Sequence, residues 1–197
     1  DRHLRLNLTA FHYDYSDLQV RAFISPGVSD ISNAATAKID GIEFEAMMLP
    51  IPNLRIVANV SYLDARYSKY PQAPGPGGII IDASGKQMNA APKFSGNVVV
   101  QYDIPLAAGD LSFRGEYFRQ ARSYFVANND PEQSQAAYDL VNASVSYTLP
   151  DDRFQVGLFG KNLANTQFVT GTASFTAAAS GRPGDPRTYG VRASFKY

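Results

Sequence analysis

The residue types in this chain that could do chemistry are carboxylates, hydroxyls and two histidines, but their spacing argues against catalysis. Glu43 and Glu45 lie two positions apart, so a strand would place both carboxylates on one face. A solvated pair that meets Arg55 is favoured over acid–base chemistry. His3 and His12 lie toward opposite ends of one segment, and no spacing marks a nucleophile with its base. We therefore expect no enzyme and no catalytic residues.

A divalent cation site is the second chemical option. Asn128, Asn129, Asp130 and Glu132 could surround Ca²⁺ with oxygen ligands. A polar external loop is favoured, and for residues 128–132 both interpretations stay open. The chain has no cysteine, which excludes disulfides and thiolate metal sites. We expect no cofactor and no metal.

The net charge bears on whether the chain has a nucleic acid partner. The chain has 18 basic and 18 acidic residues in 197, so its formal net charge is zero. Nothing in this balance indicates a nucleic acid partner. No run of residues reaches the apolar length of a transmembrane helix. Any membrane crossing would therefore have to use strands.

The final segment, residues 187–197, carries the strongest pattern. Side chains alternate faces along a strand, and here one parity is wholly apolar while the other is polar and basic. About eleven residues at roughly 3.3 Å each would cross a bilayer core when tilted. The apolar face ends in aromatics, which gather at the membrane–water interface of barrels. We predict that four residues of this strand face lipid: Tyr189, Val191, Phe195 and Tyr197.

The same alternation recurs along the chain. In the first segment the apolar parity changes after Ala10, where the aromatics from Phe11 take the other parity, which predicts a bulge or twist near Ala10. Residues 14–17 predict a tight turn, after which a second strand begins at Leu18. The strands expected are residues 3–15, 18–24, 38–48, 54–62, 94–104, 111–117, 141–149, 154–161 and 187–197.

Short turns rich in Pro and Asp alternate with long loops rich in Gly, Pro and Ala. The turns are residues 49–53, 105–110 and 150–152, and the later loops are residues 67–91, 120–137 and 171–186. A soluble β-sandwich has shorter strands and no such difference between its two ends. We predict an all-β transmembrane antiparallel up-and-down β-barrel, with short periplasmic turns and long extracellular loops.

Two groups of residues follow from this fold. The polar parity of the strands would face the barrel lumen, where a charge costs little. Aromatic and arginine side chains at the outer strand ends suit flat or anionic ligands, although an aromatic girdle with solvated bases is the plainer alternative. The lumen-facing set is Glu43, Glu45, Arg55, Arg114, Glu116, Lys161 and Arg192, and the ligand-binding loop set is Arg66, Tyr67, Tyr70, Arg119, Arg122, Tyr124 and Phe125.

Three stretches resemble a known family. They are NAATAKIDGIEFEA (33–46), GLFGKNLANTQF (157–168) and GDPRTYGVRASFKY (184–197), and they are similar to the C-terminal barrel of TonB-dependent outer-membrane receptors. The resemblance implies a barrel of about 22 strands filled by an N-terminal plug. It also implies energy-coupled import of a scarce ligand, such as a ferric siderophore, across the outer membrane of a Gram-negative bacterium. A passive, porin-like outer-membrane channel is the alternative function.

The same resemblance implies partners. They are the rest of the same receptor (upstream strands and plug), TonB through the N-terminal part, outer-membrane lipid, the barrel assembly machinery and a small-molecule or metal-chelate ligand. Residues 1–197 would supply about nine C-terminal strands, whereas bacterial single-chain barrels use even numbers. We therefore expect a fragment that does not close on itself. The last strand is expected to act as an assembly signal as well as a lipid anchor.

Overall fold

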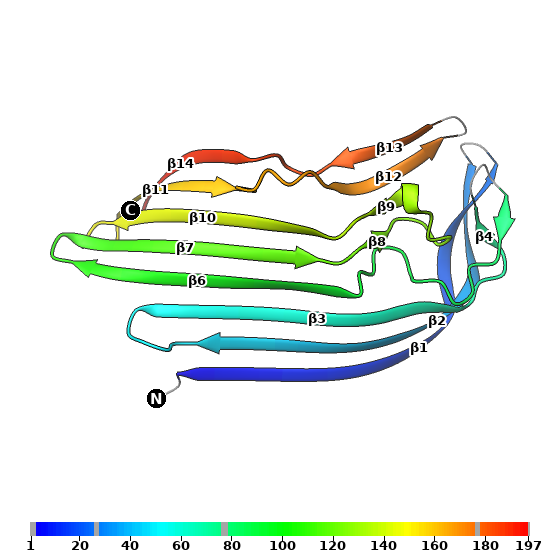
Figure 1. Ribbon diagram of the computed structural model, residues 1–197, viewed down its shortest axis with the longest axis horizontal. Coiled ribbons are helices and arrows are strands. Elements are labelled where there is room, and N and C mark those ends of the chain that lie inside the picture. The colour runs from blue at the N-terminus through cyan, green and yellow to red at the C-terminus, as the bar shows by residue number, and fades with distance from the viewer. Residues whose placement is uncertain (1–2, 26–27, 76–78, 176–177, 197) are drawn as a thin grey trace.

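The computed structural model describes residues 3–25, 28–75, 79–175 and 178–196. Its main feature is one sheet of eight strands, in which every strand pairs antiparallel with its neighbours in chain order. Figure 1 shows these strands side by side. They are β1 (Leu4–Ser25), β2 (Val28–Met48), β3 (Leu54–Lys69), β6 (Phe94–Leu106), β7 (Gly109–Gln120), β10 (Tyr138–Thr148), β11 (Phe154–Lys161) and β14 (Thr188–Phe195).

At one end of the sheet, the strands are joined by short turns that need left-handed backbone. Asn53 and Asp152 have φ of 66° and 56°, a conformation that short polar side chains tolerate. Gly109 has φ of 134°, and a Cβ there would lie 2.2 Å from the carbonyl oxygen of Thr148. Glycine is thus required where β7 begins beside β10. The predicted short turns are confirmed.

The opposite end carries longer connections that contain secondary structure of their own, on the right in Figure 1. The predicted loop 171–186 is largely a hairpin rather than an irregular segment. The short elements of this end are β4 (Ala73–Pro74), β5 (Ile80–Ile81), β8 (Ser123–Tyr124), the 3₁₀ helix η2 (Pro131–Gln133), β9 (Ser134–Gln135), β12 (Val169–Phe175) and β13 (Ala178–Pro183). Residues 76–78 of the predicted loop 67–91 lie outside the described residues.

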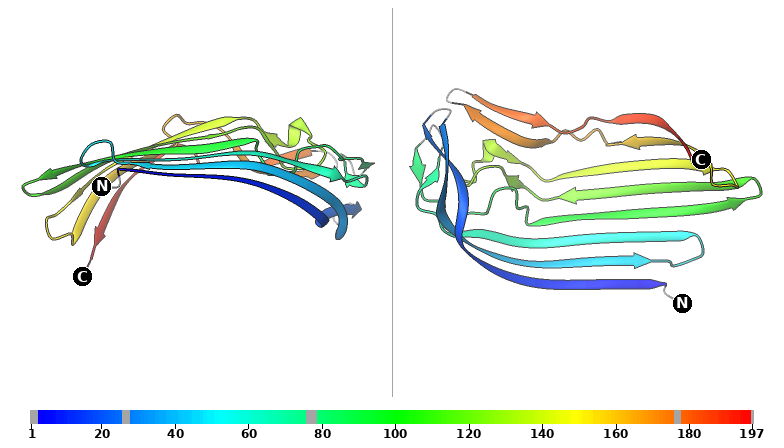
Figure 2. Two further views of the ribbon diagram at one scale, coloured as in Figure 1. Left: turned by 90° about the horizontal axis from the view of Figure 1, so that it is seen from below. Right: turned by 180° about the vertical axis from the view of Figure 1, so that it is seen from behind.

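The prediction for the start of the chain is wrong in two respects. Pairing of β1 with β2 runs without interruption from Leu4 to Tyr15, so there is no bulge near Ala10. The register shifts between Tyr15 and Leu18 instead, and Asp17 has φ of 55°. The expected turn at residues 14–17 is therefore an irregularity within one 22-residue strand. Beyond it the β1–β2 hairpin turns away from the other strands, as Figure 2 shows.

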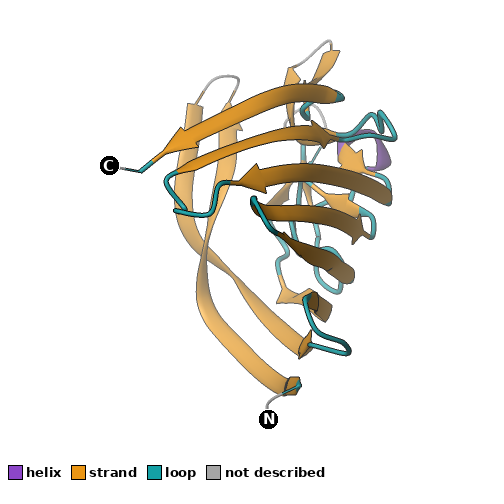
Figure 3. Cartoon of the chain, turned by 90° about the vertical axis from the view of Figure 1, so that its left-hand side faces the viewer, coloured by secondary structure: helices purple, strands orange, loops and turns teal. Residues whose placement is uncertain are grey.

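The register divides the sheet into an apolar face and a polar face, because opposed residues on paired strands point the same way. Leu8 pairs with Phe44 on the apolar face, while Thr9 pairs with Glu43 on the polar face. All seven residues predicted to face the lumen belong to the parity of the polar face. Figure 3, viewed along the strands, shows the sheet curved like part of a barrel wall.

The buried apolar cluster lies where the long connections meet one end of the sheet. It consists of Ala35, Tyr67, Tyr70, Ala73 and Ala83. The apolar face itself is uncovered: Leu8, Val191 and Phe195 are 73%, 69% and 65% exposed. Such a large exposed apolar surface requires another apolar medium or partner. Among the described residues, no helix is long and apolar enough to cross a membrane.

The last strand provides a direct test of the two faces. Phe195 pairs with Phe154 on the apolar face, and Ser194 pairs with Gln155 on the polar face, whereas Tyr197 lies outside the described residues. In the intact protein, we expect Phe195→Asp to lower the assembled fraction by up to about fivefold, since a carboxylate facing an apolar medium near the end of a strand costs up to about 1 kcal/mol. Ser194→Asp is the matched control and should assemble normally. Heat-modifiable migration in gels measures both, and equal assembly would overturn the assignment of the faces.

Candidate functional site

Tyr67 and Tyr70, both predicted to contact ligand, lie in the buried cluster at the outer end. Their exposed fractions are 2% and 1%, and their ring centroids are 5.1 Å apart. The Tyr67 hydroxyl donates a hydrogen bond to Asn89. Burial, together with the neighbouring Tyr67, raises the pKa of Tyr70. Both rings support the loop from within, because the small side chains of Ala73 and Ala83 leave room for them. The prediction that they present a surface to a ligand is not supported.

Arg66 and Arg119, from the same predicted set, point to the apolar face. Arg66 Nε lies 2.9 Å from Asp64 Oδ1, and its Nη1 donates to the Gly85 carbonyl oxygen at 3.0 Å. Arg119 Nη1 lies 3.0 and 3.1 Å from the two oxygens of Asp139. The structure thus separates these two arginines from the polar face.

Arg122, Tyr124 and Phe125 lie together in the connection between β7 and β10. Arg122 is exposed, and its Nη1 lies 3.3 Å from Ser134 Oγ. Tyr124 and Phe125 are half-buried, and the backbone of Phe125 donates to the Gln133 carbonyl oxygen at 2.9 Å. These three remain the part of the predicted loop set that can meet a ligand.

Asn129 joins two of the long connections. Its Oδ1 accepts from the Gln87 backbone N–H at 2.9 Å, and its Nδ2 donates to the Gln87 carbonyl oxygen at 2.8 Å. Beside this pair, Lys86 Nζ donates to the Asn128 carbonyl oxygen at 3.0 Å. The Ala90 backbone N–H also donates to the carbonyl oxygen of Tyr124, at 2.7 Å. The side-chain amide of Asn129 therefore makes the same two hydrogen bonds to Gln87 that a paired strand residue would make, and it links the two loops.

Two buried amides extend this network to the connection before β14. Gln135 is 8% exposed, and its Oε1 accepts from the Val169 backbone N–H at 2.6 Å. Asn162, in the stretch that resembles the receptor family, is 4% exposed. Its Nδ2 donates to the carbonyl oxygens of Thr166 and Asp185 at 2.9 and 3.0 Å. The sequence identified Asn162 only as part of a family stretch, and its hydrogen bonds explain why an amide is needed there.

For residues 128–132, the structure favours the polar loop over the Ca²⁺ site. Asp130 caps η2, with its Oδ1 accepting from the Glu132 backbone N–H at 2.9 Å. Asn128 Oδ1 accepts from the Asp130 backbone N–H at 3.2 Å. These side-chain oxygens of Asn128 and Asp130 thus accept hydrogen bonds from backbone N–H groups. In the part of the chain that the structure describes, no group of three or more His, Cys, Asp or Glu residues could hold a metal.

Sequence reasoning missed an aromatic row on the polar face of β1, formed by Phe11, Tyr13 and Tyr15. Successive ring centroids are 5.3 and 6.2 Å apart, and the two tyrosines are 51% and 48% exposed. Phe11 covers Gly41, where a Cβ would lie 2.2 Å from the ring. The bulge expected near Ala10 would have turned these rings to the other face. Unbroken alternation from Arg5 onward is the signal that would have found them.

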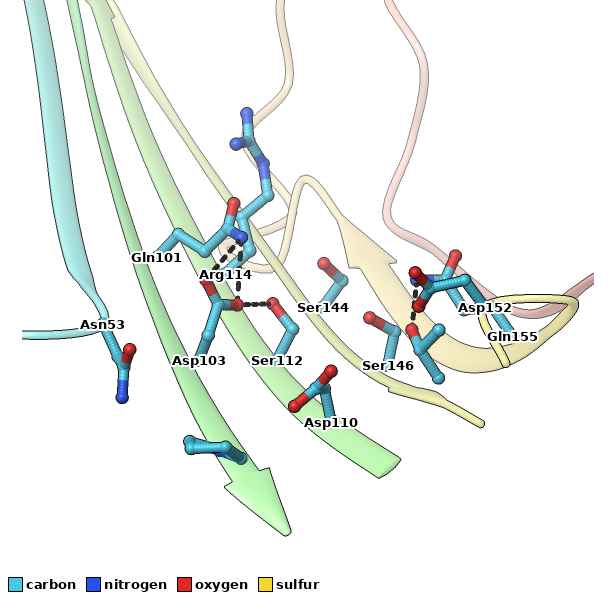
Figure 4. A pocket seen from close by; sticks show the side chains of 12 residues that line it. Asn53, Gln101, Asp103, Asp110, Ser112, Arg114, Ser144, Ser146, Asp152 and Gln155 are labelled. Atoms are coloured by element: carbon cyan, nitrogen blue, oxygen red, sulfur yellow. Dashed lines mark hydrogen bonds between the residues drawn. The ribbon is translucent and has the colours of Figure 1, made fainter. Parts of the chain in front are cut away.

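The other end of the polar face contains a hollow of about 530 Å³ near the short turns. In Figure 4, Gln101 and Ser112 both reach Asp103. Gln101 Nε2 and Ser112 Oγ donate to Asp103 Oδ1 at 3.0 and 2.5 Å. Arg55, expected to meet the glutamate pair, donates instead to Gln101 Oε1 at 3.0 Å. Glu45 accepts from Asn7 at 3.0 Å. Polar side chains therefore line this end of the polar face.

The family model described as TonB dependent receptor-like, beta-barrel, matches residues 1–163. The chain belongs to the TonB-dependent receptor β-barrel family. Its fold is similar to that of the ferric yersiniabactin uptake receptor FyuA from Yersinia pestis, with a TM-score of 0.82 and 18% identity over 100% of this chain and 28% of that one. It is also similar to the siderophore receptor PiuA from Acinetobacter baumannii, with a TM-score of 0.71 and 23% identity over 98% of this chain and 26% of that one.

A third similar structure is BauA, the ferric preacinetobactin receptor from Acinetobacter baumannii, with a TM-score of 0.71 and 20% identity over 98% of this chain and 27% of that one. The chain therefore spans little more than a quarter of the receptors it resembles. Among the described residues of these two groups, Tyr13, Tyr15 and Arg122 are exposed, and Tyr124 and Phe125 lie half-buried in the same loop as Arg122. The other predicted loop residues hold the structure together.

The Asn129 link between loops can be tested by hydrogen exchange on the intact receptor. Asn129→Ala removes both bonds to Gln87, so the local opening free energy should fall by about 1–3 kcal/mol. The Gln87 amide should then exchange at least about fivefold faster. Asn128→Ala is the matched control, because its side chain serves only its own loop through Asp130. Equal exchange of the Gln87 amide in both variants would show that the loops are held by other contacts.

Proposed function

We propose that this chain is the C-terminal part of the barrel domain in a TonB-dependent receptor of the Gram-negative outer membrane. On this proposal, the receptor imports a scarce ligand, such as a ferric siderophore, by energy-coupled transport. Family membership supports the proposal, and so do the names of the similar structures, which are receptors for ferric chelates. The single observation that carries it is a one-layer sheet with an uncovered apolar face, a polar face and a structured layer of loops at one end.

Membrane placement follows from the two faces. The apolar face would contact lipid, and the polar face would line the lumen and meet the plug. Within the described residues, β1 and β14 each pair with one neighbour only. In lipid, each unpaired backbone group would cost several kcal/mol, so the upstream strands of the receptor are the natural partners for these edges. The barrel assembly machinery and TonB, through the N-terminal part, complete the proposed set of partners.

Ligand contact is assigned to the outer end of the polar face. Tyr13 and Tyr15 offer exposed rings that can stack on a flat or apolar group. Arg122 supplies a guanidinium that can pair with an anionic group, and Tyr124 lies in the same loop. Because hydrogen bonds hold the loops together, these side chains would meet the ligand from a preorganised surface.

Energy coupling separates this function from that of a passive channel. Cells carrying the intact receptor should accumulate a radiolabelled ferric siderophore, and a protonophore should abolish the accumulation. Surface binding of the siderophore should persist after the protonophore is added. Uptake that continues unchanged without the proton gradient would overturn the proposal in favour of a porin-like channel.

The assigned contacts can be tested by binding of the siderophore to the purified receptor. We expect the double variant Tyr13→Ala/Tyr15→Ala to weaken binding at least about fivefold, since each lost aromatic contact costs about 0.5–1.5 kcal/mol. Arg122→Ala and Tyr124→Ala should also weaken it. Tyr189→Ala is the matched control, because Tyr189 is 66% exposed on the apolar face. Unchanged affinity in all three test variants would remove this surface from the site.

A further inference from the structure

The imidazole of His12 lies between two carboxylates from two different strands. Its Nδ1 is 2.7 Å from Asp40 Oδ1 on β2, and its Nε2 is 3.0 Å from Asp14 Oδ2 on β1. Both distances are within hydrogen-bonding range. A neutral imidazole has one N–H donor, whereas an imidazolium has two. With both carboxylates ionised, both hydrogen bonds can therefore form only when His12 is protonated.

The charges on β1 and β2 balance only when His12 is protonated. His12 pairs with Asp40 across the two strands, and Asp14 pairs with Lys38. Lys38 Nζ lies 3.8 Å from Asp14 Oδ1, which is longer than a hydrogen bond. Two carboxylates thus face one lysine and one histidine. The group is neutral with an imidazolium, and it carries one excess negative charge with a neutral imidazole.

The charged groups of β3 do not replace this contact. Asp64 pairs with Asp40 across β2 and β3, so a further carboxylate lies beside Asp40. Asp64 Oδ1 accepts from Arg66 Nε at 2.9 Å, and Lys93 Nζ lies 3.9 Å from the same oxygen. These two bases are therefore directed to Asp64, and the negative charge of Asp40 is left to His12.

His12 lies beyond the apolar band of its face. The apolar residues of β2 on this face reach Ile42, which pairs with Ala10 on β1 and with Tyr62 on β3. His12 and Asp40 form the next pair of this face toward the outer end, and their side chains are 54% and 64% exposed. On the proposed membrane placement, the imidazole is therefore in contact with water and can exchange its proton with the medium.

The neighbouring carboxylates set the pKa of the imidazole. The hydrogen bond to Asp40, followed by the one to Asp14, raises the pKa of His12 above its ordinary value. The same contact with His12 lowers the pKa of Asp14. A raised histidine pKa means that the stabilisation is complete below the ordinary value of about 6.5 and is lost as the pH rises through the raised value. The contact between β1 and β2 should thus weaken on the alkaline side.

This contact lies immediately before the irregularity in β1. Uninterrupted pairing with β2 ends at Tyr15, and the register shifts before Leu18. Beyond the shift, the β1–β2 hairpin turns away from the other strands (Figure 2). Asp14, one of the two carboxylates, is the residue next to Tyr15. The link from His12 to both strands is therefore at the base of the outer part of the hairpin.

We propose that His12, Asp14 and Asp40 form a proton-dependent latch: protonated His12 joins β1 to β2 at the base of the outer hairpin, and neutral His12 lets the hairpin open locally. The inference rests on the proposed membrane placement and not on ligand transport. Tyr13 and Tyr15 stand on the opposite face of the same stretch of β1. The latch therefore controls how firmly the proposed ligand-contacting rings are held.

Hydrogen exchange on the complete purified receptor tests the latch without any variant. The exchange rate of residues 11–20 is divided by that of residues 94–104, a segment without histidine, because pH changes the intrinsic exchange of both segments alike. The ratio should rise about threefold between about pH 5.5 and about pH 8.5, as expected for the loss of an exposed charge-assisted contact. A ratio that stays constant over this range overturns the inference.

His12→Gln removes the titrating group and should make the ratio independent of pH. His3→Gln is the matched control, because His3 is at the inner end of the same strand, where its Nδ1 lies 3.2 Å from the Leu49 carbonyl oxygen. This control should keep the pH dependence of the wild type. A His12→Gln receptor whose ratio still rises with pH overturns the inference.

The role of Asp40 is tested by NMR titration of the receptor with labelled histidine rings, in which the His12 signal is the one that His12→Gln removes. Asp40→Asn should move the His12 midpoint down toward its ordinary value, because the larger cause of the raised pKa is gone. Glu43→Gln, a carboxylate change on the opposite face of β2, should leave the midpoint unchanged. An Asp40→Asn midpoint equal to that of the wild type contradicts the latch. Absence of siderophore uptake with a normal pH-dependent exchange ratio counts against the proposed function alone.

Discussion

The structure depends on backbone pairing within a single layer of strands. In the described ranges, the short β4–β5 sheet packs only at one end of the eight-stranded sheet, where Ala73 joins Ala35 and Tyr67, so most of the sheet's stability cannot come from a conventional two-layer core. Each inner strand pairs with a neighbouring strand on both sides. In lipid, that pairing is obligatory, because no water can replace a lost hydrogen bond. The apolar face can then remain uncovered by protein, with lipid as its solvent.

Beyond the strand ends, the backbone is arranged differently at the two ends of the sheet. Short turns at one end use left-handed residues such as Asn53 and Gly109 to reverse the chain at once. At the other end, the buried side-chain amide of Gln135 pairs with the backbone of a neighbouring connection, and that of Asn162 joins two parts of its own connection. Long loops therefore need not be mobile. Here they form a layer that can hold exposed side chains in fixed positions.

Much of the fold could be predicted from alternation, because a strand with two unlike faces has period two in its sequence. The prediction failed at β1, where the aromatics from Phe11 onward were taken for the apolar face after a bulge. They lie on the polar face, so a prediction from hydrophobicity alone placed them on the wrong face of the sheet. The burial of Tyr67 and Tyr70 could not be predicted, for another reason. Their burial depends on Ala35, Ala73 and Ala83, which come from distant segments, and alternation within one strand carries no such information.

Residue type alone could not show which arginines lie on the apolar face of the sheet, but strand register does. Arg66, Arg119 and Arg122 all lie near the outer end, and all seemed equally suited to an anionic ligand. Arg66 and Arg119 share the parity of Tyr62 and Tyr117, so they stand on the face proposed to meet lipid. A shift of one residue in either strand would exchange the two faces. Under the proposed function, strand register therefore decides whether a guanidinium would meet the ligand or the membrane, which amino-acid composition alone does not show.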